Sequence, residues 1–185
     1  MFKYKLKKIS FVIYCILYLV SCTKAIDFSQ TEDLVLKPIN EISLIFFNAP
    51  ANEFFKGGSE VEEVSDFIES NLFRGKFIND NTDRVDFVFE VENSINRVYR
   101  IDIDFINEFD DLVYELSFST EASTDNSIIT TQHIEIFEDE DLVALKQTSK
   151  FNFTLTMLPG IAINNNTPGR INLQSKSILY SNIEL

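Results

Sequence analysis

Cys22 is the residue whose type and position predict a defined chemistry. Its thiol is a nucleophile, and the small residue Ser21 stands directly before it. Residues 1–8 carry four lysines and no acid, and residues 9–20 form an apolar run. A basic stretch followed by about 7–15 apolar residues is typical of a secretory signal. The run is too short for a spanning helix, which needs about 20 apolar residues. The sequence therefore predicts a signal peptide at residues 1–21 that ends at a reactive thiol.

The four residues at this junction, Leu19, Val20, Ser21 and Cys22, resemble the bacterial lipobox. The resemblance implies that the thiol receives a diacylglyceryl group and that cleavage before Cys22 exposes an amine for acylation. Each buried methylene contributes about 0.8 kcal/mol, so two or three acyl chains hold a protein on a membrane essentially permanently. An ordinary secretory signal that is cleaved near Ser21 is the alternative.

The residues after the anchor predict which membrane face the protein occupies. Thr23 is not aspartate, so the inner-membrane retention signal of enteric lipoproteins is absent. Some lipoproteins of the Bacteroidota carry acids directly after the cysteine and are displayed on the surface, whereas here Asp27 is the first acid. We therefore expect an outer-membrane anchor that faces the periplasm rather than the cell surface.

The remaining composition excludes several kinds of chemistry. Cys15 leaves with the signal and Cys22 takes the lipid, so residues 22–185 have no thiol for a disulfide or a thiolate metal site. His133 is the single histidine, which excludes a histidine-rich metal site. The signal holds four of the 16 Lys and Arg and none of the 29 Asp and Glu, so residues 22–185 carry a formal charge of −17. Such a surface repels nucleic acids. We expect no cofactor and no catalytic residue.

Two acidic segments and one histidine are weaker candidates. Oxygen side chains alternate through residues 79–83, and Glu90 follows at the twelfth position of a calcium-loop spacing. However, Arg84 stands where such a loop needs glycine, so we favour a plain polar turn. The acidic run 138–141 is interpreted as a helix N-terminus, where the helix dipole favours acids. In a strand, His133 faces opposite to Ile134 and Ile136, and we interpret it as an exposed structural residue.

Most of the chain shows the period of two that is typical of half-buried strands. Three consecutive strands separated by polar turns read as an antiparallel meander over residues 85–118. The run 41–48 is apolar on nearly both faces, so we expect a central strand there. Shorter strands are expected at 34–37, 128–137, 151–157 and 171–185.

Two helices interrupt this pattern. Ser59 and Glu62 form a capping box, and the apolar residues that follow fall at spacings of three, four and four. These signals predict one amphipathic helix at about 59–73, which we place as a lid over a sheet and over the paired rings Phe46-Phe47 and Phe54-Phe55. A short helix is expected at 138–148. The stripe of the longer helix comprises Val61, Val64, Ile68 and Leu72.

Together these elements predict a mainly β protein: an antiparallel two-sheet sandwich, immunoglobulin-like in the broad sense. The expected organisation is a signal peptide at 1–21, a polar tether at 22–32 and a single sandwich domain at 33–185. The domain resembles small lipoproteins of the Bacteroidota, particularly the flavobacterial kind, and this resemblance implies no activity. It is carried by Leu34-Val35-Leu36-Lys37-Pro38, by Asp86-Phe87-Val88-Phe89-Glu90 with Asn96-Arg97 after it, and by Pro168-Gly169-Arg170-Ile171-Asn172-Leu173.

Three hypotheses for function follow from this organisation. The first is a non-enzymatic, lipid-anchored binding or accessory module of an outer-membrane complex, with an outer-membrane protein as its partner, because a tether raises the local concentration at the membrane. The second is a carbohydrate- or peptide-binding lipoprotein of nutrient capture, which an exposed aromatic patch would favour. The third, which we disfavour, is a hydrolase that uses two facing carboxylates in a cleft.

Overall fold

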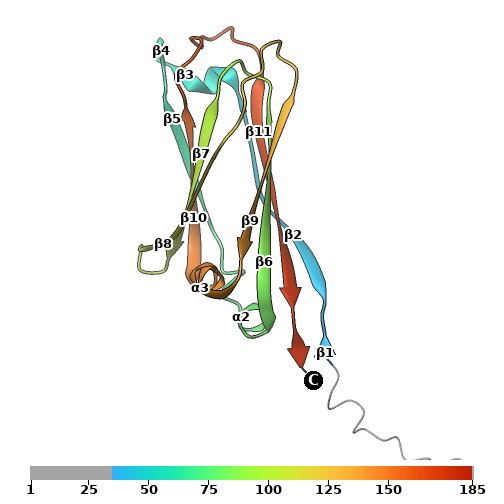
Figure 1. Ribbon diagram of the computed structural model, residues 1–185. Coiled ribbons are helices and arrows are strands. Elements are labelled where there is room, and N and C mark those ends of the chain that lie inside the picture. The colour runs from blue at the N-terminus through green and yellow to red at the C-terminus, as the bar shows by residue number, and fades with distance from the viewer. Residues whose placement is uncertain (1–34, 185) are drawn as a thin grey trace, which may run out of the picture. The chain divides into compact units, whose positions relative to one another are not determined.

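The computed structural model describes residues 35–184, which fold mainly as β-strands (Figure 1). Two helices and one 3-10 turn lie between the strands: η2 (Ala51–Phe54), α2 (Lys76–Asn81) and α3 (Asp139–Gln147). The short strands are β1 (Val35–Leu36), β3 (Phe55–Lys56), β4 (Ser59–Glu60) and β12 (Ile183–Glu184). The long strands are β2 (Ile39–Pro50), β5 (Glu63–Glu69), β6 (Thr82–Asn93), β7 (Tyr99–Asn107), β8 (Leu112–Ser119), β9 (Ile129–Phe137), β10 (Thr148–Met157) and β11 (Arg170–Ser181).

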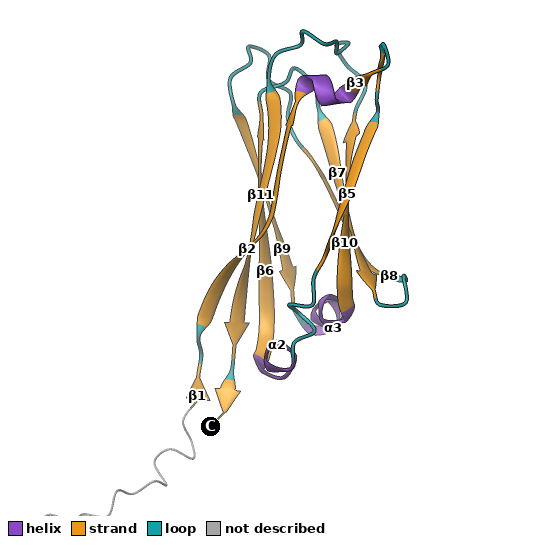
Figure 2. Ribbon diagram, turned by 180° about the vertical axis from the view of Figure 1, so that it is seen from behind, coloured by secondary structure: helices purple, strands orange, loops and turns teal. Residues whose placement is uncertain are grey.

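The eight long strands form two four-stranded antiparallel sheets that face each other (Figure 2). One sheet has the order β2-β11-β6-β9 and the other has the order β5-β10-β7-β8. Consecutive long strands change sheet at every step except β7 to β8. This order is that of an eight-stranded jelly roll, one form of the double-sheet sandwich. The predicted fold class, a mainly β antiparallel sandwich, is therefore confirmed, with jelly-roll rather than immunoglobulin strand order.

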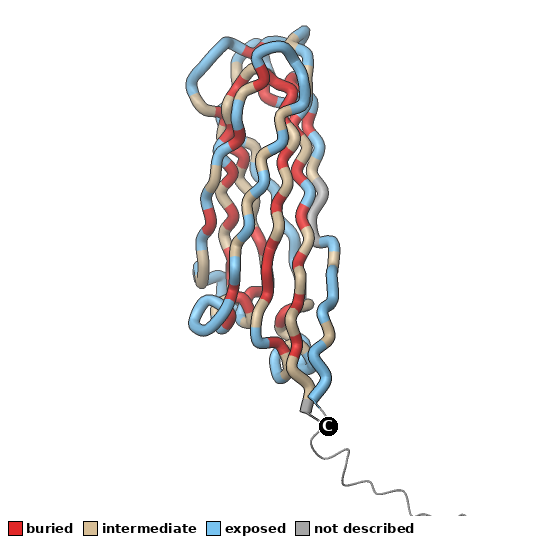
Figure 3. Tube along the Cα trace, turned by 45° about the vertical axis from the view of Figure 1, so that its right-hand side comes forward, coloured by how far each residue is buried: buried red, intermediate tan, exposed pale blue. Residues whose placement is uncertain are grey.

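The core lies between the two sheets and is dominated by phenylalanine. Buried positions alternate with more exposed ones along strands such as β6 and β11 (Figure 3). Phe87, at the middle of β6, is almost fully buried, and its ring lies 5.2–6.2 Å from five other phenylalanine rings. Edge-to-face packing of such rings adds stability beyond the area that they bury. The neighbours of Phe87 are Phe73, Phe89, Phe105, Phe137 and Phe151.

The predicted helix at 59–73 is wrong, because this segment forms β4 and β5 instead. Residues four apart lie on one face of a helix, but they also lie on one face of a strand, since four is an even number. Val64 and Ile68 therefore fit either structure. The seven-residue pairing of β5 with β10 decides in favour of the strand. The lid predicted from this helix therefore does not form; Phe54 is buried against Tyr99 instead, with ring centroids 4.8 Å apart.

Two further predictions about strand neighbours are wrong. The strand at 41–48 is an edge strand rather than a central one, because within residues 35–184 β2 pairs only with β11. The meander at 85–118 holds for β7 and β8, but β6 lies in the opposite sheet. Hydrophobic alternation gives the face that each residue occupies and says nothing of the sheet to which a strand belongs.

The predicted strands at 34–37, 128–137, 151–157 and 171–185 and the predicted short helix at 138–148 are confirmed. Strand β1 forms within 34–37 and pairs with β12, and helix α3 forms within 138–148. Leu142 and Leu145 are the buried residues of α3, and its first turn holds Asp139, Glu140 and Asp141. The acidic run is therefore a helix N-terminus, as its sequence indicates.

Burial of the Tyr99 phenol predicts a loss of stability at alkaline pH. Burial raises the pKa of Tyr99 well above its usual value of 10.0, and its hydroxyl has no hydrogen-bond partner among the described residues. Above about pH 10 the unfolded chain releases this proton while the folded chain keeps it, so stability falls as pH rises, by up to about 1.4 kcal/mol per pH unit for this group.

The variant Tyr99→Phe should therefore match the wild type near neutral pH and lose less stability above about pH 10. Urea unfolding at a series of pH values measures this difference. An identical alkaline decline in the two proteins would show that Tyr99 is not responsible.

Candidate binding cleft

The residues that the sequence assigns to the anchor, Leu19, Val20, Ser21 and Cys22, lie outside the described residues. The predicted signal peptide and tether lie there too. Within residues 35–184, no helix is both long enough and apolar enough to cross a membrane. Lipidation at Cys22 thus stays a prediction, and the structure of the sandwich has to supply any candidate binding site.

The residues that have the spacing of a calcium loop do not surround a common site. Asn79, Asp80 and Asn81 belong to helix α2, and Glu90 lies well inside strand β6, so no loop joins them. In the described part of the chain, no three acidic, histidine or cysteine side chains gather as metal ligands would.

His133 occupies the inner face of β9, which corrects the prediction that it is exposed. Its side chain is 29% exposed, whereas Ile134 and Ile136 on the other face expose 51% and 42% of their surface. The fully buried Phe137 shares the face of His133 and sets the phase of the strand. The buried ring of Phe137 therefore decides which face of β9 points inward, although Ile134 and Ile136 on the other face are also apolar.

The imidazole of His133 is held by packing and by one carboxylate. It stacks on the ring of Phe118, with centroids 4.8 Å apart and planes 4° from parallel. Its Nε2 lies 3.0 Å from an oxygen of Glu135, and the other oxygen of Glu135 accepts the hydroxyl of Tyr114. Burial and the bond to Glu135 both raise the pKa of the Tyr114 phenol. This cluster links β8 to β9 across one edge of the sandwich, and we interpret it as structural.

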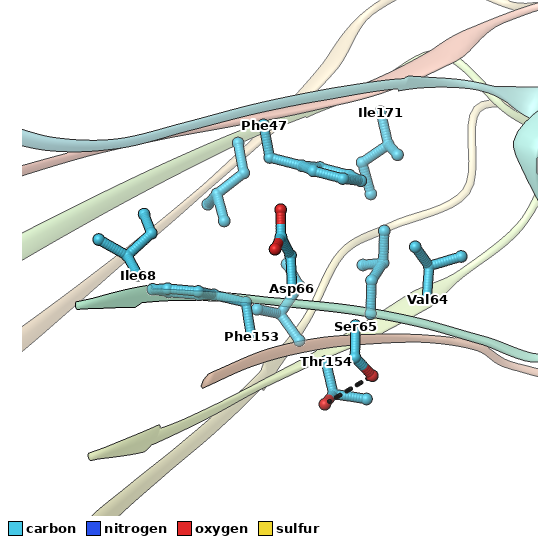
Figure 4. Close-up of a pocket in the computed structure, with 11 residues that line it drawn as sticks. Phe47, Val64, Ser65, Asp66, Ile68, Phe153, Thr154 and Ile171 are labelled. Carbon is cyan, nitrogen blue, oxygen red and sulfur yellow. Dashed lines mark hydrogen bonds between the residues drawn. The ribbon is translucent and has the colours of Figure 1, made fainter. Parts of the chain in front are cut away.

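The opposite edge of the sandwich is open. Strands β2 and β5 each end their sheet on that side, and an apolar cleft lies between them (Figure 4). Together with its mouth, the first part of this cleft has an empty volume of about 590 Å³. Its walls come from both sheets: Phe47, Val64, Ser65, Asp66, Ile68, Ile101, Phe153, Thr154, Leu155, Ile171 and Leu173.

A second cavity extends the cleft along β5. Together with the open space at its mouth, it has an empty volume of about 690 Å³, and it shares Ile68 with the first cavity. Its floor is made by core phenylalanines, including Phe87 and Phe105. The cleft is therefore elongated along the strand direction, and an extended apolar group fits it better than a compact one. Concave, mostly apolar sites with few polar groups are typical of small-molecule binding sites.

Strand β5 sets which side chains enter the cleft. Because β5 pairs with β10, Val64, Asp66 and Ile68 lie on the same face as Phe153 and Leu155 of that strand. The intervening Ser65 faces away and lies 3.3 Å from the hydroxyl of Thr154 (Figure 4). Asp66 is thus a carboxylate on an otherwise apolar wall, and Figure 4 shows it pointing toward the side of the cleft where Phe47 lies.

The acids of the cleft do not form a facing pair. Asp66 lines the first cavity and Glu69 lines the second, but both come from β5. An odd spacing of three places their side chains on opposite faces of that strand. Glycoside hydrolysis needs two carboxylates on either side of a bond. The geometry of β5 does not provide this arrangement.

A buried ion pair fixes the start of β5. Arg97 follows β6, and its guanidinium lies 3.3 Å from the carboxylate of Glu60 in β4. It also donates to the carbonyl oxygens of Leu158 and Ile161. Glu60 in turn accepts the backbone N–H of Ile163 at 2.6 Å. This network joins the chain before β5 to the loop after β10 and so holds the end of the cleft.

Comparisons with known proteins give similarity of fold only. No protein-family profile and no curated protein matches the sequence. Among solved structures, a Parabacteroides distasonis protein that is thought to be secreted aligns over 62% of this chain and 36% of its own, at 13% identity and a TM-score of 0.42. The VP2 particle of infectious bursal disease virus aligns over 78% and 37%, at 8% identity and a TM-score of 0.42.

A chain in the structure of desmodium yellow mottle tymovirus aligns over 82% of this chain and 89% of its own, at 8% identity and a TM-score of 0.32. This chain thus spans little more than a third of the bacterial protein and of VP2. Similarities at this level do not extend to ligands or partners, so the fold assignment depends on the strand order of the chain itself.

Proposed function

We propose that the chain is a lipid-anchored envelope lipoprotein that acts as a non-enzymatic binding module, with the cleft between β2 and β5 as its binding site. The observation that carries this proposal is the apolar, elongated cleft that opens at one edge of the sandwich. Lipid on Cys22 would hold this cleft beside the outer membrane, on the periplasmic side, where an outer-membrane protein could deliver or receive what it binds. The absence of a facing acid pair on β5 supports binding over hydrolysis.

Binding in the cleft can be tested with an apolar fluorescent probe and two neighbouring residues. Ile68 lines both cavities and is 37% exposed, whereas Phe67 lies on the other face of β5 and is 58% exposed. N-Phenyl-1-naphthylamine should bind the full mature chain, residues 22–185, with Cys22→Ser to keep it free of lipid. Ile68→Lys should abolish binding, because an apolar probe in the cleft would strip water from the ammonium at a cost of several kcal/mol, and Phe67→Lys should not.

Thermal melting of both variants separates lost binding from lost folding. Binding that survives Ile68→Lys in a folded protein would place the probe elsewhere, and the cleft would no longer be the proposed site.

The anchor has its own test in the two cysteines of the sequence. Cells fed labelled palmitate should label the wild type and Cys15→Ser, because Cys15 leaves with the signal peptide. Cys22→Ser should lose all label and should no longer pellet with membranes, since no acyl chain remains to hold it. Labelling of Cys22→Ser, or an unlabelled wild type, would contradict lipidation at this residue.

A further inference from the structure

On the outer edge of β5, which pairs with no other strand among the described residues, one backbone N–H is already hydrogen-bonded to the Asp66 side chain. The backbone N–H of Ser70 donates to the carbonyl of Ser149, and the N–H of Met157 donates to the backbone carbonyl of Glu62. The even-numbered residues of this stretch therefore direct their backbone groups toward the neighbouring strand. The odd-numbered residues therefore direct theirs outward. One outward N–H, that of Phe67, donates to the Asp66 carboxylate at 2.8 Å. A strand added to this edge would have to displace that bond, and an inward charge on an edge strand opposes such pairing.

The Asp66 carboxylate has no cationic partner within residues 35–184. Eight ion pairs lie in this part of the chain, and none includes Asp66. An apolar chain that fills the cleft would strip water from this carboxylate. The loss is costly unless the ligand returns a hydrogen bond or a charge. A ligand with an anionic group would add repulsion to the same loss.

We propose that the cleft takes an amphiphile with a single apolar chain and a cationic head group, which pairs with Asp66 at the mouth while the chain lies along β5. This inference rests on the proposed function and adds the chemical class of the ligand. The elongated apolar walls accommodate the chain, and the charge of −17 on residues 22–185 attracts a cation toward the surface. The capped edge of β5 favours such an amphiphile over an extended peptide.

Three probes with the same chain and different head groups test this inference. Dodecylammonium, dodecanol and dodecanoate are titrated below their micelle concentrations into residues 22–185 carrying Cys22→Ser, by calorimetry. Dodecylammonium should bind most tightly. Asp66→Asn should weaken it about five-fold, which is the effect of one partly exposed ion pair, and should leave dodecanol unchanged. The control Glu63→Gln removes the same charge from the other face of β5 and should change neither.

The outcomes separate the two proposals. If all three probes bind equally, or if Asp66→Asn in a folded protein leaves dodecylammonium unchanged, the cationic class is wrong and apolar binding stands. If no probe binds, the proposed function itself fails. An equal loss in Glu63→Gln and Asp66→Asn would assign the preference to overall charge and overturn the role of Asp66.

Discussion

Replacing Arg97 with alanine is expected to lower the free energy of unfolding by about 3–5 kcal/mol, the cost of breaking a buried ion pair from one side. The Arg97 side chain is 6% exposed, and Glu60 beside it is 30% exposed. Alanine would leave the Glu60 carboxylate with the N–H of Ile163 but without its cationic partner. The carbonyls of Leu158 and Ile161 would also lose the donor that Arg97 supplies. Urea unfolding of residues 22–185 measures the loss.

Arg100→Ala is the matched control for this prediction. Arg100 also pairs with a carboxylate, that of Asp102 at 2.8 Å, but its side chain is 45% exposed. Surface pairs of this kind contribute about 0–1 kcal/mol, so the control should lose little stability. Equal losses in the two variants would show that burial of the Arg97 network does not decide the energetics of this end of the cleft.

Gly169→Ala is expected to destabilise the protein by about 3 kcal/mol or more, from backbone strain and steric overlap together. Gly169 has φ of +101°, and a Cβ there would lie 2.4 Å from the backbone oxygen of Ser94. The surrounding chain cannot move away freely. Ser94 exchanges hydrogen bonds with Arg170, and Ala51 donates to the Gly169 carbonyl, so three strand ends meet at this point.

Gly58→Ala separates strain from overlap. Gly58 has φ of +88°, but no atom lies within 4 Å of the position that a Cβ would take. Only the strain of the left-handed conformation applies, and a loss of about 1–2 kcal/mol is expected. Thermal or urea unfolding of both variants tests the prediction, which a smaller loss in Gly169→Ala than in Gly58→Ala would contradict.

The sequence predicts the sandwich because apolar residues at alternate positions mark the inner face of each strand. In β6, Val85, Phe87, Phe89 and Val91 alternate with polar or outward residues, and all four are buried. Antiparallel sheets with one solvated face produce this pattern. The sheet to which each strand belongs depends on pairings between distant parts of the chain, such as β2 with β11, which alternation does not encode.

The helix at 59–73 shows how local signals mislead. The capping box and the spacing of Val64 and Ile68 are compatible with a helix. However, the same spacing places Val64, Asp66 and Ile68 on one face of a strand. The neighbouring strand β10 decides, because seven residue pairs give β5 a partner along one edge, where the backbone groups of alternate residues are hydrogen-bonded. Tertiary pairing thus overrides local preference.

The cleft could not be located from the sequence, although the unusual position of its acid, Asp66, is visible there. Val64-Ser65-Asp66-Phe67-Ile68 places an acid in phase with apolar neighbours, which is unusual on the inner face of a strand. This signal is visible only if the segment is assigned as a strand. The partner wall, which includes Phe47, comes from a strand in the other sheet, and its approach is a property of the fold.

Photocrosslinking in the native envelope tests most directly whether the cleft is the binding site. Phe153 lines the cleft, and Phe109 is 76% exposed on the turn between β7 and β8. p-Azidophenylalanine at position 153 should form an adduct with a small apolar molecule under ultraviolet light in intact cells, whereas the same group at position 109 should not. Adducts at 109 alone, or at neither position in folded protein, would contradict occupancy of the cleft.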